Sequence, residues 1–264
     1  MLNNANLKNI APKDFRQKVR QGEWGEPTAN VCFGYAQANL VIVPKDMAFE
    51  FFLFCLRNWM ACPVIDATQA GSPHPSLVAP EADLRTDLPV YRVFRNGKLA
   101  DEPTDITGYW RDDLVCFLLG CINTIDWAFR VAGIKFRRLG AFTSNIECVQ
   151  AGRFSGPMAV SLRLFKGTES LIRAIQISSR FPNAHGVPVH IGDPAAIGIS
   201  DICHSDFVPH ANAAPQQPDE TAVFWGCGIT VELAALRAKL PLMITHKAGH
   251  MFVTDLLAGE FAIL

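Results

Sequence analysis

The chain has 264 residues, of which 49% are hydrophobic and 19% are charged, and its formal net charge at pH 7 is −1. This composition is typical of a compact globular protein and excludes a mainly disordered one. Lysine and arginine are scattered apart from the run at residues 135–138, which we interpret as a solvated face. With no basic field or polybasic patch, we expect no nucleic-acid partner and no membrane partner.

The N-terminal region and the cysteines indicate a cytoplasmic protein. Residues 1–21 are polar and lack the apolar core of a signal peptide, and the longest apolar runs, at 47–56 and 114–121, are too short to span a bilayer. The eight cysteines include no C-x-x-C pair, so neither a zinc knuckle nor a redox dithiol is predicted. We expect reduced thiols and no cofactor, with a divalent metal left open.

The first quarter of the chain predicts a helix followed by a strand–helix–strand unit. Residues 11–20 have the pattern of a short helix, and the apolar run 40–43, stopped by a proline, is typical of a buried strand. A helix with a broad apolar face is expected over 45–58, and a second strand over 62–66. This order favours an α/β layer with a parallel sheet.

The middle of the chain predicts a smaller α+β unit. After a polar loop at 67–88, residues 90–99 indicate a hairpin, because Asn96-Gly97 suits a type I′ turn. A helix is predicted from Asp112 to about Arg130, then a strand over 159–164 and a helix from Gly167 to about Arg180. We interpret this unit as an insertion.

The last third returns to strand and helix patterns. Strands are predicted at 187–191, 222–225 and 242–245, with a helix over 231–239. The predicted fold class is α/β: a layered mixed or parallel sheet with flanking helices, plus an inserted smaller α+β domain. The main domain takes residues 1–88 and 183–264, and the inserted domain takes 89–182.

Polar, glycine-flanked segments follow three predicted strands in the last third. Gly192-Asp193 ends the segment that carries His185 and His190, Cys227 stands between two glycines, and His246 follows the last strand. Parallel sheets bind ligands outside the carboxyl ends of their strands. These segments therefore predict a shared cleft, although each histidine read alone is as consistent with a hydrogen-bonded structural residue.

The residue types leave two further chemistries open. His185, His190, Asp193, His246 and His250 carry the atoms that a divalent ion prefers, but none of the pairs has the H-E-x-x-H spacing of a helical zinc site. A thiol between glycines at position 227 could act as a nucleophile if a neighbouring histidine lowered its pKa. A buried, inert thiol is the alternative.

Several long motifs resemble the D-glutamate cyclase family, the YcsI-like proteins often labelled hydro-lyases. The motifs run in order over nearly the whole chain, at residues 34–40, 83–89, 117–121, 185–194, 223–228 and 244–251. The resemblance implies a two-part α/β architecture with an inserted unit and a bacterial, cytoplasmic setting in amino acid metabolism. It also implies lyase chemistry, the closure of D-glutamate to 5-oxo-D-proline with loss of water.

That reaction calls for a base, an acid and cations that hold carboxylates. We expect His185 or His190 to be the base, with Asp193 orienting it, and His246 to be the acid or an oxyanion donor. Arg163 and Lys247 are the expected carboxylate anchors. The remaining candidates for binding the substrate are Asn39, Cys121, Asp126, Cys227 and His250.

Two other functions remain open on the sequence. One is a non-catalytic protein that binds a small amino or keto acid, such as an accessory protein in 5-oxoproline metabolism. The other is a metal-assisted hydrolase that uses the histidines. The expected partner in every case is a small acid, and a homo-oligomer is left open.

Overall fold

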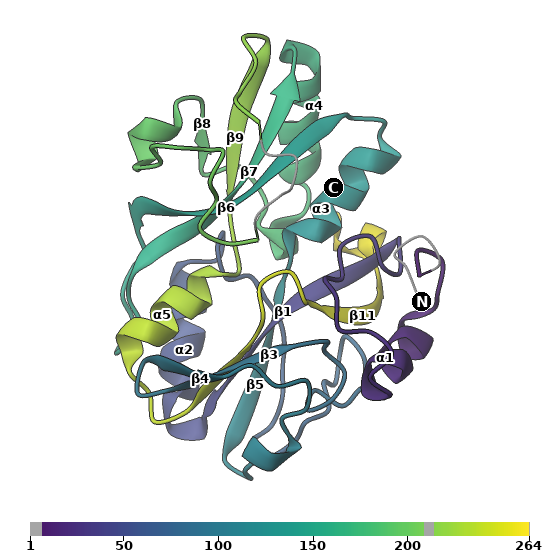
Figure 1. Ribbon diagram of the computed structural model, residues 1–264, viewed down its shortest axis with the longest axis vertical. Helices are drawn as coiled ribbons and strands as arrows, with labels where there is room; N and C mark the ends of the chain where they lie inside the picture. The colour runs from purple at the N-terminus through teal and green to yellow at the C-terminus, as the bar shows by residue number, and fades with distance from the viewer. Residues whose placement is uncertain (1–6, 209–213, 264) are drawn as a thin grey trace.

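The computed structural model describes residues 7–208 and 214–263, which form two sheets with helices packed around them (Figure 1). The helices are α1 Pro12–Arg20, α2 Lys45–Arg57, α3 Ile122–Val131, α4 Thr168–Ser178 and α5 Thr230–Ala238. Short 3-10 turns are η1 Thr107–Tyr109, η2 Pro182–Ala184, η3 Pro194–Ile197 and η4 Ala258–Phe261. No helix of the described part of the chain is long and apolar enough to cross a membrane.

The first sheet forms the lower part of the molecule in Figure 1 and is centred on β1. Its strands are β1 Tyr35–Pro44, β2 Val64–Ala67, β3 Tyr91–Arg95, β4 Lys98–Asp101, β5 Leu114–Gly120, β10 Met243–His246 and β11 Phe252–Leu257. Their order is β2-β5-β1-β10-β3-β4, with β11 paired to β1. Residues 36–43 of β1 are all buried, as expected of an apolar strand that is covered on both faces.

The second sheet forms the upper part, and it shares a core with the first. Its strands are β6 Phe136–Glu147, β7 Pro157–Lys166, β8 His190–Ile191 and β9 Glu220–Gly226, in the order β6-β7-β9-β8. The largest hydrophobic cluster joins Val41 and Phe117 of the first sheet to Leu162 and Phe224 of the second. The two sheets are therefore held together by buried side chains and do not pack as separate units.

The predicted α/β class is confirmed, but the expectation of a parallel sheet is wrong. All strand pairings found among the described residues are antiparallel. The strand–helix–strand unit at the start of the chain does not close a parallel pair, because β5 inserts between β1 and β2 and pairs with each of them. A strand from elsewhere in the sequence thus separates β1 from β2 and pairs antiparallel with each of them.

The sheets do not divide the chain at the predicted domain boundaries. Strands β3, β4 and β5 fall inside the predicted insertion, 89–182, yet they belong to the first sheet. Strands β8 and β9 fall outside it, yet they complete the second sheet with β6 and β7. The chain crosses between the sheets at α3 and again after β9.

Individual elements were predicted unevenly. The hairpin at 90–99 is confirmed, and both Asn96 and Gly97 have the positive φ that a type I′ turn requires. The helix predicted from Asp112 is wrong in its first half, because Leu114–Gly120 is the buried strand β5 and α3 begins only at Ile122. The strand predicted at 187–191 shrinks to the two residues of β8.

Candidate functional site

A cavity lies where strands of both sheets meet the start of α3, and we call it the central cavity. Its polar lining residues are Asn39, Cys121, Asn123, Arg138, Ser161, Cys227 and His246. Asn39 and His246 come from β1 and β10 of the first sheet, whereas Arg138 and Ser161 come from β6 and β7 of the second. The empty space, counted with the part open to solvent, is about 440 Å³.

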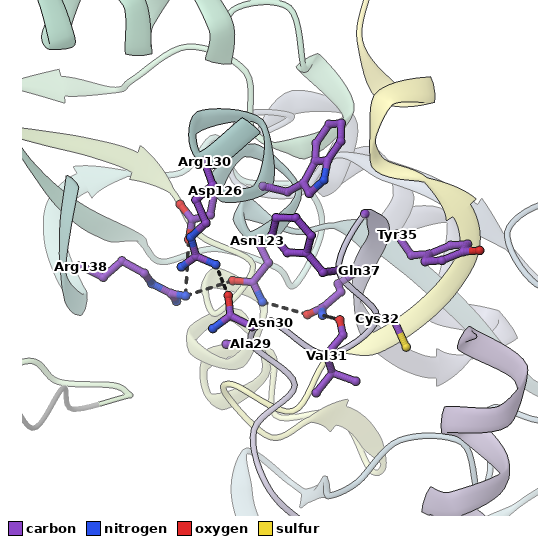
Figure 2. A pocket seen from close by; sticks show the side chains of 13 residues that line it. Ala29, Asn30, Val31, Cys32, Tyr35, Gln37, Asn123, Asp126, Arg130 and Arg138 are labelled. Atoms are coloured by element: carbon purple, nitrogen blue, oxygen red, sulfur yellow. Dashed lines mark hydrogen bonds and ion pairs between the residues drawn. The ribbon is translucent and has the colours of Figure 1, made fainter. Parts of the chain in front are cut away.

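A second cavity, the adjoining cavity, shares Asn123 and Arg138 with the first (Figure 2). Polar contacts cross it in a chain. Arg138 Nη1 lies 3.3 Å from Asn123 Oδ1, and Asn123 Nδ2 donates to Gln37 Oε1 at 2.8 Å. Gln37 Nε2 in turn donates to the main-chain oxygen of Thr28 at 2.8 Å. These hydrogen bonds hold the side-chain amide of Asn123, which faces both cavities, in one orientation.

Arg138 is the cation at the junction of the two cavities, and its partners are loosely placed. Its Nη1 atom lies 3.4 Å from Asp126 Oδ2, longer than a well-formed charged hydrogen bond. Arg137, the preceding residue on β6, instead forms two bonds of 2.7 Å with Glu220. The solvated face predicted at 135–138 is therefore wrong for Arg138, because alternation along the strand turns it inward.

The guanidinium of Arg163 is hydrogen-bonded to a carboxylate inside the protein. Its Nε and Nη2 atoms form a bidentate pair with Asp126 at 2.7 and 2.9 Å, and both side chains are buried. Burial alone would raise the pKa of Asp126, but the guanidinium charges of Arg163 and Arg138 outweigh it and hold the pKa below its usual value. Asp126 lines the adjoining cavity, whereas Arg163 lines neither cavity. The predicted anchoring role of Arg163 is thus taken up by an internal partner.

His246 is the one predicted catalytic histidine that lines the central cavity. Its Nδ1 atom faces the main-chain oxygen of Leu40 at 3.4 Å. Because a carbonyl oxygen only accepts, Nδ1 carries the proton and Nε2 is left as an acceptor. Burial lowers the pKa of His246 to about 4, so that the imidazole is neutral at pH 7. A neutral imidazole can accept a proton during a reaction, so a base role is open to His246.

His185, His190 and Asp193 do not join His246. His185 is fully buried at the end of η2, where Nδ1 donates to Met60 O at 2.9 Å. His190 lies on the edge strand β8 and donates from Nε2 to the main-chain oxygen of Asp193 at 2.8 Å. The Asp193 carboxylate caps η3 by accepting from Ala195 N. None of the three lines either cavity, so the predicted convergence is not found.

The physical reason is strand direction. The prediction of a shared cleft assumed parallel strands, whose carboxyl ends meet at one edge. In the structure β8 and β9 are antiparallel, so that the turn after β8 and the Gly-Cys-Gly segment after β9 lie at opposite ends of the sheet. Cys227 and His246 do meet, since β9 and β10 both end at the central cavity.

Two other predicted binding residues also lie apart from the cavities. Lys247 Nζ pairs with Glu102 at 2.9 Å. The mostly buried His250 donates from Nδ1 to Ala248 O at 3.0 Å. Gly249 and Met251, on either side of His250, line the central cavity instead. The segment after β10 thus contributes backbone and an apolar side chain where histidine and lysine were expected.

The thiols of Cys121 and Cys227 line the central cavity in their protonated form. Burial raises the pKa of Cys121 to about 12 and raises that of Cys227 as well. A thiol must lose its proton to act as a nucleophile, so these values disfavour the cysteine nucleophile that the sequence left open. Gly228 has a steric role, because a Cβ there would lie 2.3 Å from Asn39 Cγ.

Sequence reasoning missed two lining residues with free polar atoms. Ser161 Oγ is buried without a hydrogen-bond partner among the described residues, and Arg138 was assigned to the surface. A hydroxyl inside the predicted strand 159–164 was the available signal for Ser161. Buried polar groups are normally satisfied, which makes an unpartnered hydroxyl facing a cavity a candidate for ligand contact. Among residues 7–208 and 214–263, no cluster of three histidine, cysteine or acidic side chains is placed to hold a metal ion.

The buried neutral histidines predict that the protein loses stability in mild acid. Burial lowers the pKa of His185 and of His246 to about 4, whereas an unfolded chain protonates histidine near its ordinary pKa of about 6.5. Between these values the unfolded state binds more protons, so stability falls as the pH falls. From pH 7 to 5.5 we expect the free energy of unfolding to drop by about 2–3 kcal/mol.

Urea unfolding at a series of pH values measures this effect. The double variant His185→Asn/His246→Asn keeps an amide donor for each main-chain oxygen but cannot titrate, so its slope between pH 7 and 5.5 should flatten. An unchanged slope in that variant would contradict the assignment.

Comparison with known proteins supports the family that the sequence motifs resemble. Residues 115–255 match the family model described as D-glutamate cyclase. A Geobacillus kaustophilus protein named "Putative hydro-lyase GK2103" is 49% identical, covering 97% of this chain and 98% of that one. The Bacillus subtilis protein named "Putative hydro-lyase YcsI" is 47% identical, covering 97% of this chain and all of that one.

A solved nitrogen repressor-like protein from Methanococcus jannaschii covers 91% of this chain and 99% of its own, with a TM-score of 0.40 and 9% identity. That likeness is too weak to carry an argument. The family match and the identity with the bacterial relatives extend over most of the chain. The chain therefore belongs to the D-glutamate cyclase family, and the names of both bacterial relatives describe a hydro-lyase.

Proposed function

We propose that this protein is a cytoplasmic lyase that closes D-glutamate to 5-oxo-D-proline, with loss of water, in the central cavity. The observation that carries the proposal is a loosely partnered guanidinium, Arg138, in the same cavity as a neutral imidazole, His246. Family membership supplies the reaction class. A cation and a base at one small-molecule site are what this chemistry requires.

The reaction moves two protons from nitrogen to oxygen. The substrate amine enters as an ammonium group and ends as a lactam N–H, a loss of two protons, while one carboxylate oxygen gains two and leaves as water. The new bond joins nitrogen to the side-chain carboxyl carbon, and a C–O bond breaks. A neutral imidazole can take the two protons from nitrogen one after the other and return each to the departing oxygen, so we assign both transfers to His246.

The carboxylates need charge neutralisation, because an ionised carboxylate is a poor electrophile. We assign Arg138 to hold one of them, since its present partners at 3.3 and 3.4 Å leave donors free. Ser161 Oγ has no hydrogen-bond partner within the described part of the chain and can donate to the oxygen that develops negative charge. Asn39 Nδ2 donates a hydrogen bond to Gly120 O at 2.8 Å, and this side chain completes the polar wall.

The reaction is tested by incubating the protein with D-glutamate, L-glutamate, both 5-oxoprolines and 2-hydroxy acids, and reading the products by chiral chromatography. We expect 5-oxo-D-proline from D-glutamate and no comparable product from the other compounds. Binding of D-glutamate by calorimetry without any product would reject the enzyme in favour of a binding protein. Elemental analysis of the same preparation tests the metal-assisted hydrolase.

Arg138→Gln should raise the KM for D-glutamate by about 10–100-fold, because a hydrogen bond to a charged group contributes about 1.5–3 kcal/mol. Arg137→Gln is the matched control: the two arginines are neighbours on β6, but Arg137 pairs with Glu220 away from both cavities. Its KM should stay near the wild-type value. Equal effects of the two substitutions would contradict the anchoring role of Arg138.

A further inference from the structure

Helix α2 and the turn that follows it carry a stripe of exposed apolar side chains on the side away from the core. Phe49, Phe52 and Leu56 of the helix are 74%, 43% and 62% exposed, and Trp59, two residues after the helix ends, is 44% exposed. The spacing of the three helical members, three and then four residues, is that of the a and d positions of a helix–helix seam. The opposite side of α2 is already buried through Phe51, Phe54 and Cys55. The stripe, which we call the α2 seam, is therefore surplus to the fold of one chain.

A hollow adjoins the seam. It is lined by Phe52, Leu56 and Trp59 on the helix side and by Pro63 and Pro182 facing them. Its empty space, counted with the part open to solvent, is about 590 Å³. Large apolar side chains around a hollow are the usual form of an anchor site in a protein interface.

We propose that the α2 seam is a dimer interface, occupied by the same seam of a second copy running antiparallel. A two-fold axis between Phe52 and Leu53 places Phe49, the most exposed member of the seam, opposite the partner's Leu56. Phe49 then enters the hollow beside the partner's Leu56. Because both copies contribute the same surface, the interface is used up in the dimer and no further copy can add, as in other two-fold interfaces.

The charges beside the seam select this arrangement. Asp46 and Arg57 are separated by about three turns, so they lie on the same flank of α2, the acid near its start and the base at its end. A two-fold axis preserves the flank and reverses the direction, which brings each Asp46 to within about 3 Å, along the axis, of the partner's Arg57. A parallel two-fold pairing would reverse the flank, so that Asp46 of one copy and Arg57 of the other would lie on opposite sides of the seam and could not pair.

Sedimentation velocity over a range of concentrations tests the proposal. We expect a dimer for the wild-type protein and a monomer for Phe49→Glu and for Leu56→Glu, each with the wild-type circular dichroism spectrum, since both side chains are exposed. Ile172→Glu is the control: it replaces a side chain of α4 that is 49% exposed and outside the seam, and it should leave the dimer intact.

Exchange of charges tests the direction of pairing. Asp46→Arg alone and Arg57→Asp alone should each weaken the dimer by about tenfold, because every dimer loses two exposed pairs and gains two repulsions. The double variant Asp46→Arg/Arg57→Asp should restore it, and failure of that rescue would overturn the antiparallel arrangement. A dimer that survives Phe49→Glu, or a wild-type monomer that sediments with phosphatidylcholine vesicles, would overturn the proposal itself.

Discussion

Replacing His246 by asparagine should lower turnover of D-glutamate by about 10²–10⁴-fold, the usual contribution of a positioned base. Asparagine keeps a donor for the main-chain oxygen of Leu40 but has no ring nitrogen to accept the substrate proton. Because the imidazole is buried and its hydrogen bond within residues 7–208 and 214–263 runs through Nδ1, the substitution leaves the main-chain contact in place. The measured quantity is kcat, with the circular dichroism spectrum and melting temperature as checks of folding.

His250→Asn is the matched control. Its ring also donates from Nδ1 to a main-chain oxygen, that of Ala248, and it follows His246 closely in sequence, yet it lines neither cavity. Turnover should stay within a few-fold of wild type. A loss of equal size in both variants, or a nearly normal kcat in His246→Asn, would reject His246 as the base.

The pH profile tests the low pKa of His246. With a pKa of about 4 in the free protein, His246 is already neutral at pH 5. We therefore expect no protonation limb near pH 6.5 in kcat/KM for the wild-type enzyme. A limb at the ordinary histidine value would contradict the burial of this imidazole.

Local chemistry was enough to predict many elements and part of the site. The turn at Asn96 and Gly97 and the helix of residues 12–20 follow from short-range preferences and are confirmed. Cys227 and His246 were predicted from their places after expected strands, and Asn39 and Cys121 were candidates within the motifs that resemble the family. The structure places all four around the central cavity, and their roles stay predictions.

What the sequence could not supply was strand direction and partner choice. The run 114–120 is apolar throughout, and such a run suits a buried strand as well as a buried helix. Only its pairing with β1 and β2, which are far away in sequence, decides for a strand. The inward turn of Arg138 likewise depends on the register of β6, a strand that was not predicted. The acid–base set expected at His185, His190 and Asp193 failed for the same reason.

The second large effect concerns stability. Asp126→Asn should lower the free energy of unfolding by about 3–5 kcal/mol, because it leaves the buried Arg163 guanidinium without a counter-charge. The bidentate pair joins α3 to β7, and the guanidinium also lies over the Trp225 ring, 6.0 Å from its centroid. Arg138 would lose its nearest carboxylate in the same step. Urea unfolding at pH 7 measures the loss.

A double-mutant cycle separates the pair from its surroundings. Arg163→Met alone should also be costly, since the Asp126 carboxylate then stays buried with only the looser Arg138 contact, whereas Arg163→Met/Asp126→Leu should cost less than the sum of the single changes. Additive effects would mean that the two side chains do not depend on each other.

The pH dependence of stability gives an independent check on the pair. The pKa of Asp126 is held below its usual value, so its contribution is complete above the ordinary carboxylate range and is lost only as the pH falls through the native pKa. Acid below the range in which the histidines titrate should therefore remove a second increment of stability in the wild type, and that increment should be missing in Asp126→Asn.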